Sequence, residues 1–319
     1  MARKIVKRNV KNVVITALAA ALIPTIQTSA NLTSQKNLEA VSYPIQGELL
    51  SQWPLFRHGS DGKLTEFYIT EPVKIESSSN VKKEFEIDPY FEKLYARRAI
   101  EIVFEKPWEK NEFQRRIDII AQYGNIIANS IDDTTMLAML TIESAGDPSA
   151  QSPTGPRGLP QFTSETARKY GLRIDTDFDE RIAPIRALPA MDAHLRDAAA
   201  IETIGSSLER MLYFYHDGLL INQSGSDLYQ SLSQRVKWYI VEIGAIKKLI
   251  EDGVLRYNPT SEYTQRLSNT LVYTPEPGET AYGIAKKHNV DLDTLHYFNP
   301  EVRNLARIPN GANLKIPKN

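Results

Sequence analysis

The sequence predicts a mainly α-helical protein with a second, smaller unit at its C-terminal end. Apolar residues between positions 113 and 127 recur at spacings of three or four, which is the spacing of one helix face. The longest such series covers residues 228–250 and predicts an amphipathic helix with one apolar stripe. Beyond residue 250 the periodicity gives way to Asp-Gly, Asn-Pro and Ser/Thr residues, a composition typical of a linker.

Composition narrows the class of protein. The chain has 319 residues, enough for about two domains. With 38 Lys and Arg residues against 39 Asp and Glu residues, it lacks the basic excess that nucleic-acid binding uses, and we expect no such partner. It contains no cysteine, which excludes disulfides, thiol nucleophiles, thiolate metal ligands and cysteine lipidation.

The first thirty residues differ from the rest. A basic start precedes an apolar run at 13–26, and small residues precede Asn31, a pattern typical of a secretory signal peptide at 1–30. The run is short for a bilayer span of roughly 20 residues. We therefore expect export to the periplasm or cell envelope, with retention as an anchor, and hence peripheral envelope association, as the alternative. Residues 31–110 are expected to form an N-terminal extension of unknown role.

Helices are expected in order through residues 111–255. The first covers 111–130, and the second begins after Asp132 and Asp133, acidic residues that suit a helix N-terminus. It runs to Ser144, where Gly146 and Pro148 supply a stop. Ser164 is the expected N-cap of a short helix at 165–170, and helices around 188–195, 208–215 and 228–250 follow.

Glu143 is the candidate catalytic residue. It falls at the C-terminal end of the second helix, where the negative end of the helix dipole opposes ionisation. Burial among its apolar neighbours would raise its pKa further, and a carboxylic acid of raised pKa can act as a general acid. Asp147 is the nearest acid in sequence, and an acid among Asp177, Asp179, Glu180 and Asp217 could approach through folding.

Four segments carry a resemblance to the soluble lytic transglycosylase family. Residues 142–148 (Ile-Glu-Ser-Ala-Gly-Asp-Pro) resemble its Glu-Ser helix end, and 158–162 (Gly-Leu-Pro-Gln-Phe) resemble its Gly-Leu-(Met/Trp)-Gln segment, with Pro160 in the Met/Trp place. Residues 212–218 resemble Ala-x-Tyr-Asn-Ala-Gly, with His216 and Asp217 replacing Asn-Ala. Residues 238–243 resemble the family's late Tyr-Val segment.

This resemblance implies a lysozyme-like helical domain at 111–255 that acts on the glycan strands of peptidoglycan. It implies cleavage of the β-1,4 bond between N-acetylmuramic acid and N-acetylglucosamine. It also implies that the muramyl 6-hydroxyl attacks its own C1 to give a 1,6-anhydro end. Glu143 would act first as general acid and then as general base. Substrate contacts are implied for Ser144, Gln161, Tyr215 and Tyr239.

No metal and no cofactor are expected. Residues 175–179 have acids at alternate positions, like the start of a calcium loop, but Glu180 stands at the sixth place and Arg186 at the twelfth. A calcium loop needs glycine and glutamate there. The five histidines show no His-Glu-x-x-His spacing, and the chain has no phosphate-binding loop.

After a linker at 256–270, residues 271–318 resemble a lysin motif, a βααβ module that binds N-acetylglucosamine-containing glycans. The opening at 272–280, the two helical stretches and the closing Leu-Lys-Ile-Pro carry the resemblance. Thr280 is expected to cap the first helix, Asn289 to adopt a left-handed conformation, and the second helix to stop at Asn299 and Pro300. The implied glycan-binding residues are Gly278, Thr280, Tyr282, Asn299 and Pro300.

The whole arrangement resembles the membrane-bound murein transglycosylases of type D, which carry C-terminal lysin motifs. Several alternatives stay open. One is an enzyme of the same fold that hydrolyses the bond like a muramidase and gives reducing ends. Others are a non-catalytic peptidoglycan-binding scaffold and a chitin-directed enzyme. The C-terminal module could also be a stabilising cap or an adaptor.

Overall fold

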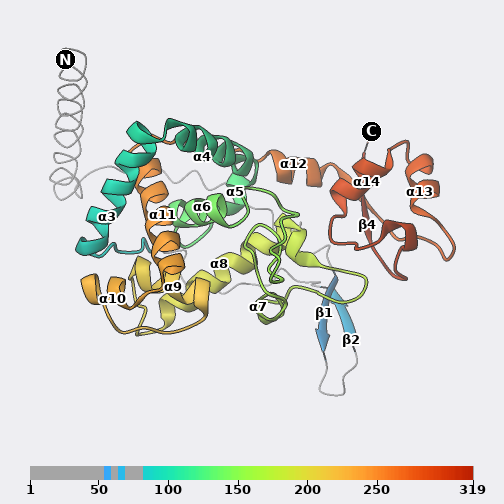
Figure 1. Ribbon diagram of the computed structural model, residues 1–319. Helices are drawn as coiled ribbons and strands as arrows, with labels where there is room; N and C mark the ends of the chain where they lie inside the picture. The colour runs from blue at the N-terminus through green and yellow to red at the C-terminus, as the bar shows by residue number, and fades with distance from the viewer. Residues whose placement is uncertain (1–53, 59–63, 69–81, 319) are drawn as a thin grey trace, which may run out of the picture. The chain divides into compact units, whose positions relative to one another are not determined.

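A computed structural model describes residues 54–58, 64–68 and 82–318 of the chain (Figure 1). The chain divides into two units, Met1–Val73 and Lys74–Asn319. In the first unit, β1 (Pro54–His58) pairs antiparallel with β2 (Leu64–Tyr68), and Pro54 lies opposite Tyr68. The expected signal peptide at 1–30 lies outside the described residues.

The second unit is mainly helical, as predicted. Its helices before the C-terminal module are α3 (Pro89–Ile100), η1 (Glu101–Glu105), α4 (Pro107–Ile120), η2 (Ala121–Tyr123), α5 (Gly124–Ile127), α6 (Asp133–Glu143), α7 (Ser164–Lys169), η3 (Glu180–Ile182), α8 (Pro184–Ala200), α9 (Leu208–Asp217), α10 (Gly225–Ser231) and α11 (Gln234–Glu251). Helix α11 packs against both α3 and α6 (Figure 1). None of the helices in the described ranges is both long and apolar enough to cross a membrane.

The contact between α3 and α11 depends on a glycine. A Cβ atom added to Gly244 of α11 would lie 2.3 Å from the Cζ atom of Tyr95, so only glycine lets this ring approach the helix. The Tyr95 hydroxyl donates to Glu209 at 2.8 Å, a contact that also ties α3 to α9. Helix α3 was placed in the N-terminal extension by its sequence, but it is part of the helical core. The core therefore begins before residue 111.

A buried ion pair fixes the start of α6 against α11. Asp132 accepts the backbone N–H of Thr135 at 2.8 Å and so caps α6, as its sequence position predicted. Lys247 of α11 lies 3.2 Å from the same carboxylate, and both side chains are buried. Asp132 also accepts from the backbone N–H of Phe85 at 3.1 Å. This pairing is what makes the two buried charges tolerable in the interior.

Two predicted helix limits are wrong. The series at 228–250 is not one helix, because Leu232 has an extended backbone and Ser233 caps α11 by accepting from Val236. Leu232 is still buried, so the apolar spacing in the sequence continues through the break between the two helices and gives no sign of it. The short helix α7 begins one residue early, since Thr163 rather than Ser164 is its N-cap.

Residues 256–270, expected as a linker, contain helix α12 (Glu262–Ser268). Tyr263 is buried, and its ring meets that of Tyr123 edge-on at 5.0 Å. The backbone N–H of Thr260 donates to the carbonyl of Ala121 at 2.8 Å. Residues 256–261 have no regular secondary structure, but the segment contains a helix and is packed on the helical core.

The C-terminal module is defined here as residues 270–317. It consists of β3 (Thr270–Tyr273), α13 (Ala281–Lys287), α14 (Leu292–Phe298), η4 (Leu305–Arg307) and β4 (Leu314–Pro317). The two strands pair antiparallel, with Thr270 opposite Pro317, which gives the βααβ order that the sequence suggested. Thr280 caps α13, Asn289 has a φ of 55°, and α14 ends before Asn299, all as predicted. That the module is a lysin motif stays a prediction.

Candidate active site

A cleft of about 740 Å³ lies in the helical domain at the C-terminal end of α6. Its walls are residues 142–145, residues 150–152, Thr154 and Pro156, residues 161–163, the 215–217 end of α9, and side chains of Arg116, Thr166, His194 and Arg235. Among these described residues the acidic ones are Glu143 and Asp217. The cleft therefore holds the predicted acid together with Ser144, Gln161 and Tyr215.

Glu143 is the last residue of α6 and is partly buried. The Tyr239 hydroxyl of α11 donates to its Oε1 atom at 2.5 Å. Burial raises the pKa of Glu143 to about 7, although the Tyr239 hydrogen bond and the positive charge of Arg235 act in the opposite direction. A carboxyl group with this pKa holds and releases a proton near neutral pH, which is what a general acid–base catalyst needs.

The turn after Glu143 has an unusual backbone. Ala145 and Gly146 follow one another with φ values of 54° and 83°, in the left-handed region that alanine rarely adopts. The buried Ser144 hydroxyl donates to the Leu140 carbonyl at 3.3 Å and accepts from the Gly146 N–H at 3.3 Å. Ser144 is thus the C-cap of α6, and its hydroxyl joins the last turn of the helix to the turn that follows Glu143. Its role as a substrate contact stays a prediction.

The opposite wall is the cleft loop, residues 150–163. Gln161 has a φ of 49°, and its side-chain amide donates to the carbonyls of Ala150 at 3.1 Å and Gly158 at 2.9 Å. The Tyr215 hydroxyl donates to the Pro160 carbonyl at 2.7 Å. Gln161 and Tyr215 therefore both line the cleft and hold the loop closed. Proline at position 160 is compatible with this turn, because the bond to Tyr215 uses only its carbonyl.

Aromatic rings pack against one another along this wall. His194 meets the rings of Phe162, Tyr170, Phe214 and Tyr215 at centroid distances of 5.0 to 5.8 Å. Its Nδ1 atom lies 2.8 Å from the Tyr170 hydroxyl. Burial, with a smaller effect from Lys169, lowers the pKa of His194 to about 4. The imidazole is therefore neutral at physiological pH and acts in packing.

Sequence interpretation missed the two arginines of the cleft. Arg235 stands four residues before Tyr239, so both lie on one face of α11, and this spacing was the available signal. Arg116 donates to the Thr141 carbonyl at 3.1 Å beside the end of α6, a contact that follows only from the packing of α4 on α6.

His216 and Asp217, noted in the sequence as replacements, both line the cleft. The His216 ring lies 4.7 Å from that of Tyr239, and its Nδ1 atom is 2.6 Å from the Asp217 carboxylate. The other acids that could have approached Glu143 are absent from the cleft lining of the described chain. Asp179 is bound by arginines outside the cleft, and Glu180 accepts from the backbone N–H of Arg173.

The glycan-binding residues expected in the C-terminal module lie outside this cleft. Tyr282 is 67% exposed, whereas the Thr280 hydroxyl accepts from the Gly283 N–H. Asn299 is fully buried: its amide donates to the carbonyls of Leu295 and Lys315 and accepts from the Lys315 N–H. The expectation that the Asn299 side chain contacts a glycan is thus replaced by a structural role, joining α14 to β4.

The acidic segment at 175–179 forms a turn. One Asp175 oxygen accepts from the backbone N–H groups of Asp177 and Phe178, each at 2.8 Å, and Arg173 pairs with the other. In the part of the chain that the structure describes, no group of three or more acidic or histidine side chains is placed to hold a metal ion.

Comparison with known proteins matches residues 124–235, just over a third of the chain, to the family described as Transglycosylase SLT domain. This range begins at α5 and ends in the first turn of α11, and it contains Glu143, Gln161 and Tyr215. No curated protein matches the chain. The family match supports a lytic transglycosylase catalytic domain of lysozyme-like type in this part of the chain.

Proposed function

We propose that the protein is a peptidoglycan lytic transglycosylase in which Glu143 is the acid–base catalyst. The bond cleaved is the β-1,4 bond from N-acetylmuramic acid to N-acetylglucosamine, and the product carries a 1,6-anhydro end. The observation that carries this proposal is one partly buried carboxyl group with a pKa of about 7 in a cleft of about 740 Å³. The match of residues 124–235 to the transglycosylase domain supports the substrate class.

The chemistry needs one proton donor that later becomes an acceptor. Because the Tyr239 hydroxyl donates to Oε1 of Glu143, the acid carries its proton on Oε2. That proton passes to the bridging oxygen as the C1–O bond of the muramyl sugar breaks. The resulting carboxylate takes the proton of the muramyl 6-hydroxyl as the O6–C1 bond forms. The acid is regenerated and no water is consumed, so a second carboxylate is not required.

We extend the proposal to the C-terminal module, which would bind N-acetylglucosamine-containing glycans as a lysin motif. Its βααβ order supports this, as does the exposed Tyr282 beside Gly278 and Thr280 at the start of α13. Binding to the same polymer would raise the local concentration of substrate at the cleft. A polymer outside the cytoplasm requires export, in agreement with the basic and apolar pattern at 1–30.

A second candidate function is hydrolysis of the same bond. Asp217 is the observation that favours it, because it lines the cleft and is hydrogen-bonded to His216. A second carboxylate able to activate water would make the enzyme a muramidase that leaves reducing ends.

Product analysis on purified sacculi tests these proposals, using the wild type, Glu143→Gln and, as a matched acid-to-amide control in the same cleft, Asp217→Asn. We expect wild type and Asp217→Asn to release fragments with anhydro ends, which are one water lighter than reducing ends. Glu143→Gln should lose at least about 100-fold in rate, the usual contribution of a general acid.

The outcomes separate the alternatives. Reducing ends that incorporate oxygen from labelled water, and that disappear in Asp217→Asn, would establish the hydrolytic function. Wild-type rates in Glu143→Gln would remove Glu143 from the mechanism. Binding to sacculi without release of any soluble fragment by the wild type would identify a scaffold.

A further inference from the structure

The segment between α7 and α8 leaves the helical domain and enters the C-terminal module. Phe178 of this segment is buried in the apolar core of the module, with Ile284, Leu295 and Val302. Its backbone forms an antiparallel bridge with Val302, and the Asp179 N–H donates to the Glu301 carbonyl at 2.8 Å. The module core is thus completed by a side chain from the catalytic half of the chain.

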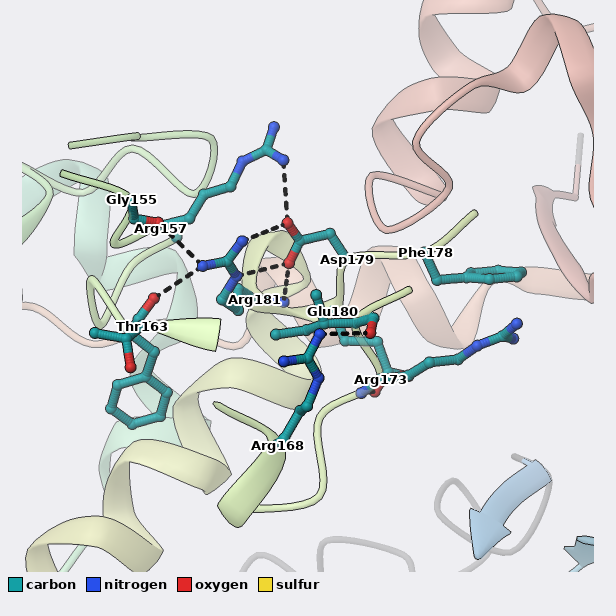
Figure 2. Close-up of polar contacts among 12 residues, drawn as sticks. Gly155, Arg157, Thr163, Arg168, Arg173, Phe178, Asp179, Glu180 and Arg181 are labelled. Carbon is teal, nitrogen blue, oxygen red and sulfur yellow. Dashed lines mark hydrogen bonds and ion pairs between the residues drawn. The ribbon is translucent and has the colours of Figure 1, made fainter. Parts of the chain in front are cut away.

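A buried carboxylate next to Phe178 joins three parts of the protein. Asp179 is completely buried and lies 2.8 Å from Nε of Arg181 and 3.1 Å from the guanidinium of Arg157 (Figure 2). Arg303 of the module is 3.3 Å away. Burial opposes ionisation of Asp179, but the hydrogen bonds and charges of these arginines hold its pKa below the ordinary value. We call these four residues the Asp179 cluster.

The cluster supports the cleft loop directly. One nitrogen of Arg181 donates to the carbonyls of Gly155 at 3.1 Å and Phe162 at 3.2 Å. Figure 2 shows the Arg181 guanidinium lying between Asp179 and Gly155. Gly158 packs so closely that an added Cβ would lie 1.9 Å from the Arg181 carbonyl. Arg157 belongs to the loop itself. Arg181 and Arg157 therefore connect the cleft loop to Asp179, and Asp179 is also bound by Arg303 of the module.

We propose that the C-terminal module holds the cleft loop in its substrate-binding shape, through Phe178 and the Asp179 cluster, in addition to any glycan that it binds itself. Phe178, Asp179, Arg181 and Arg303 are positioning residues in this account. A tether changes only the capture of an insoluble polymer, whereas loss of this support would change the cleft even for a soluble fragment.

Hydrogen–deuterium exchange of the full-length protein tests the proposal without reference to activity. The variants are Phe178→Ala and Arg303→Gln, with Phe178→Leu as the conservative rescue. The matched control is Arg307→Gln, which removes an exposed arginine from the same module. We expect amides of residues 150–163 to exchange at least about tenfold faster in the first two variants, because local opening becomes easier. Phe178→Leu and Arg307→Gln should leave them protected.

Kinetics on a short soluble peptidoglycan oligosaccharide add a second readout, which rests on the proposed function. Phe178→Ala and Arg303→Gln should raise KM by about tenfold with a smaller change in kcat, since a misplaced wall weakens binding. Glu143→Gln should instead lose kcat.

Unchanged exchange at 150–163 in both variants would overturn the proposal. So would an equal rise of exchange in α3 and α11, because that indicates general destabilisation. If Phe178→Ala does not fold, Arg303→Gln decides. A wild type without activity would contradict the proposed function, while the exchange experiment would still decide whether the module supports the loop.

Discussion

Glu143 and Asp179 show how the same chemical group is adjusted in opposite directions within one domain. Burial removes water from both carboxyl groups, partly from Glu143 and completely from Asp179, and this favours the neutral form. Glu143 has the Tyr239 hydroxyl as a hydrogen-bond partner and Arg235 as a nearby positive charge, and burial outweighs both, so its pKa rises to about 7. Asp179 has arginines against both oxygens, and its pKa falls below the ordinary value. Only the first carboxyl group can exchange a proton near neutral pH.

The position of Glu143 at a helix end was easier to predict from the sequence than the residues that surround it. Glu143 could be placed at a helix end because Gly146 and Pro148 follow it, and Gln161 and Tyr215 reach the same cleft as the motifs suggested. The sequence signal for Arg235 was only its spacing of four residues from Tyr239, and its effect on Glu143 depends on which face of α11 meets the cleft. The burial of Asn299 was equally out of reach, since its partner Lys315 lies in a distant strand.

Replacing Arg235 by Gln tests the electrostatics of the site. The positive charge lowers the pKa of Glu143, so its removal should raise that pKa. Since the proposed mechanism needs the protonated acid, activity should fall as pH rises through the pKa, and this alkaline limb should move to higher pH in the variant. The measurement is kcat/KM on soluble glycan between pH 5 and 9.

Lys237→Gln is the matched control, because it removes the same charge from the same helix at a side chain that lies over Tyr229. Its limb should coincide with that of the wild type. A downward movement in Arg235→Gln, or equal movements in both variants, would contradict the assigned effect of Arg235.

At the scale of elements, helices defined by periodicity and caps were predictable, and their interruptions were not. The break between α10 and α11 escaped because Leu232 remains buried on the same stripe. Helix α12 escaped because it is short and its burial depends on Tyr123, far away in sequence. The need for a glycine inside a helix was equally unpredictable, because it depends on how closely a side chain of the neighbouring helix approaches.

Gly244→Ala tests the fit of α3 against α11. Alanine is the better helix former by roughly 1 kcal/mol, but its methyl group would meet the Tyr95 ring at 2.3 Å. Overpacking of this kind typically costs about 1 to 3 kcal/mol, so after the gain in helix propensity we expect a net loss of about 1 kcal/mol in the free energy of unfolding. Denaturant titration followed by circular dichroism measures it.

Gly283→Ala provides the comparison, because this exposed helical glycine would bring its Cβ only within 3.3 Å of the Thr280 hydroxyl. It should be neutral or slightly stabilising. A Gly244→Ala variant as stable as the wild type would show that α3 and α11 can separate without cost.

At the scale of the molecule, residues 74–319 form one unit rather than two bodies joined by a linker. The sequence indicated a boundary near 256–270 from composition, but residues 262–268 of this segment form helix α12. It could not indicate that Phe178 completes the module core or that α12 packs on the helical domain, because both contacts join residues far apart in sequence.

Differential scanning calorimetry of the full-length protein measures whether the helical domain and the module unfold together. Independent modules unfold in separate steps, whereas a shared core and a shared buried ion cluster predict one cooperative transition for the helical domain and the module together. A distinct low-temperature transition, with the helical domain still folded, would contradict the packing of the module described here.

The central claim is that the Glu143 carboxyl group is protonated in a substantial fraction of molecules at neutral pH. Carbon-13 NMR of protein labelled at the glutamate side-chain carboxyl, with Glu143→Gln identifying the resonance by its disappearance, follows this group through a pH titration. The account predicts a midpoint near pH 7. A midpoint near 4.5, the ordinary value for glutamate, would contradict it.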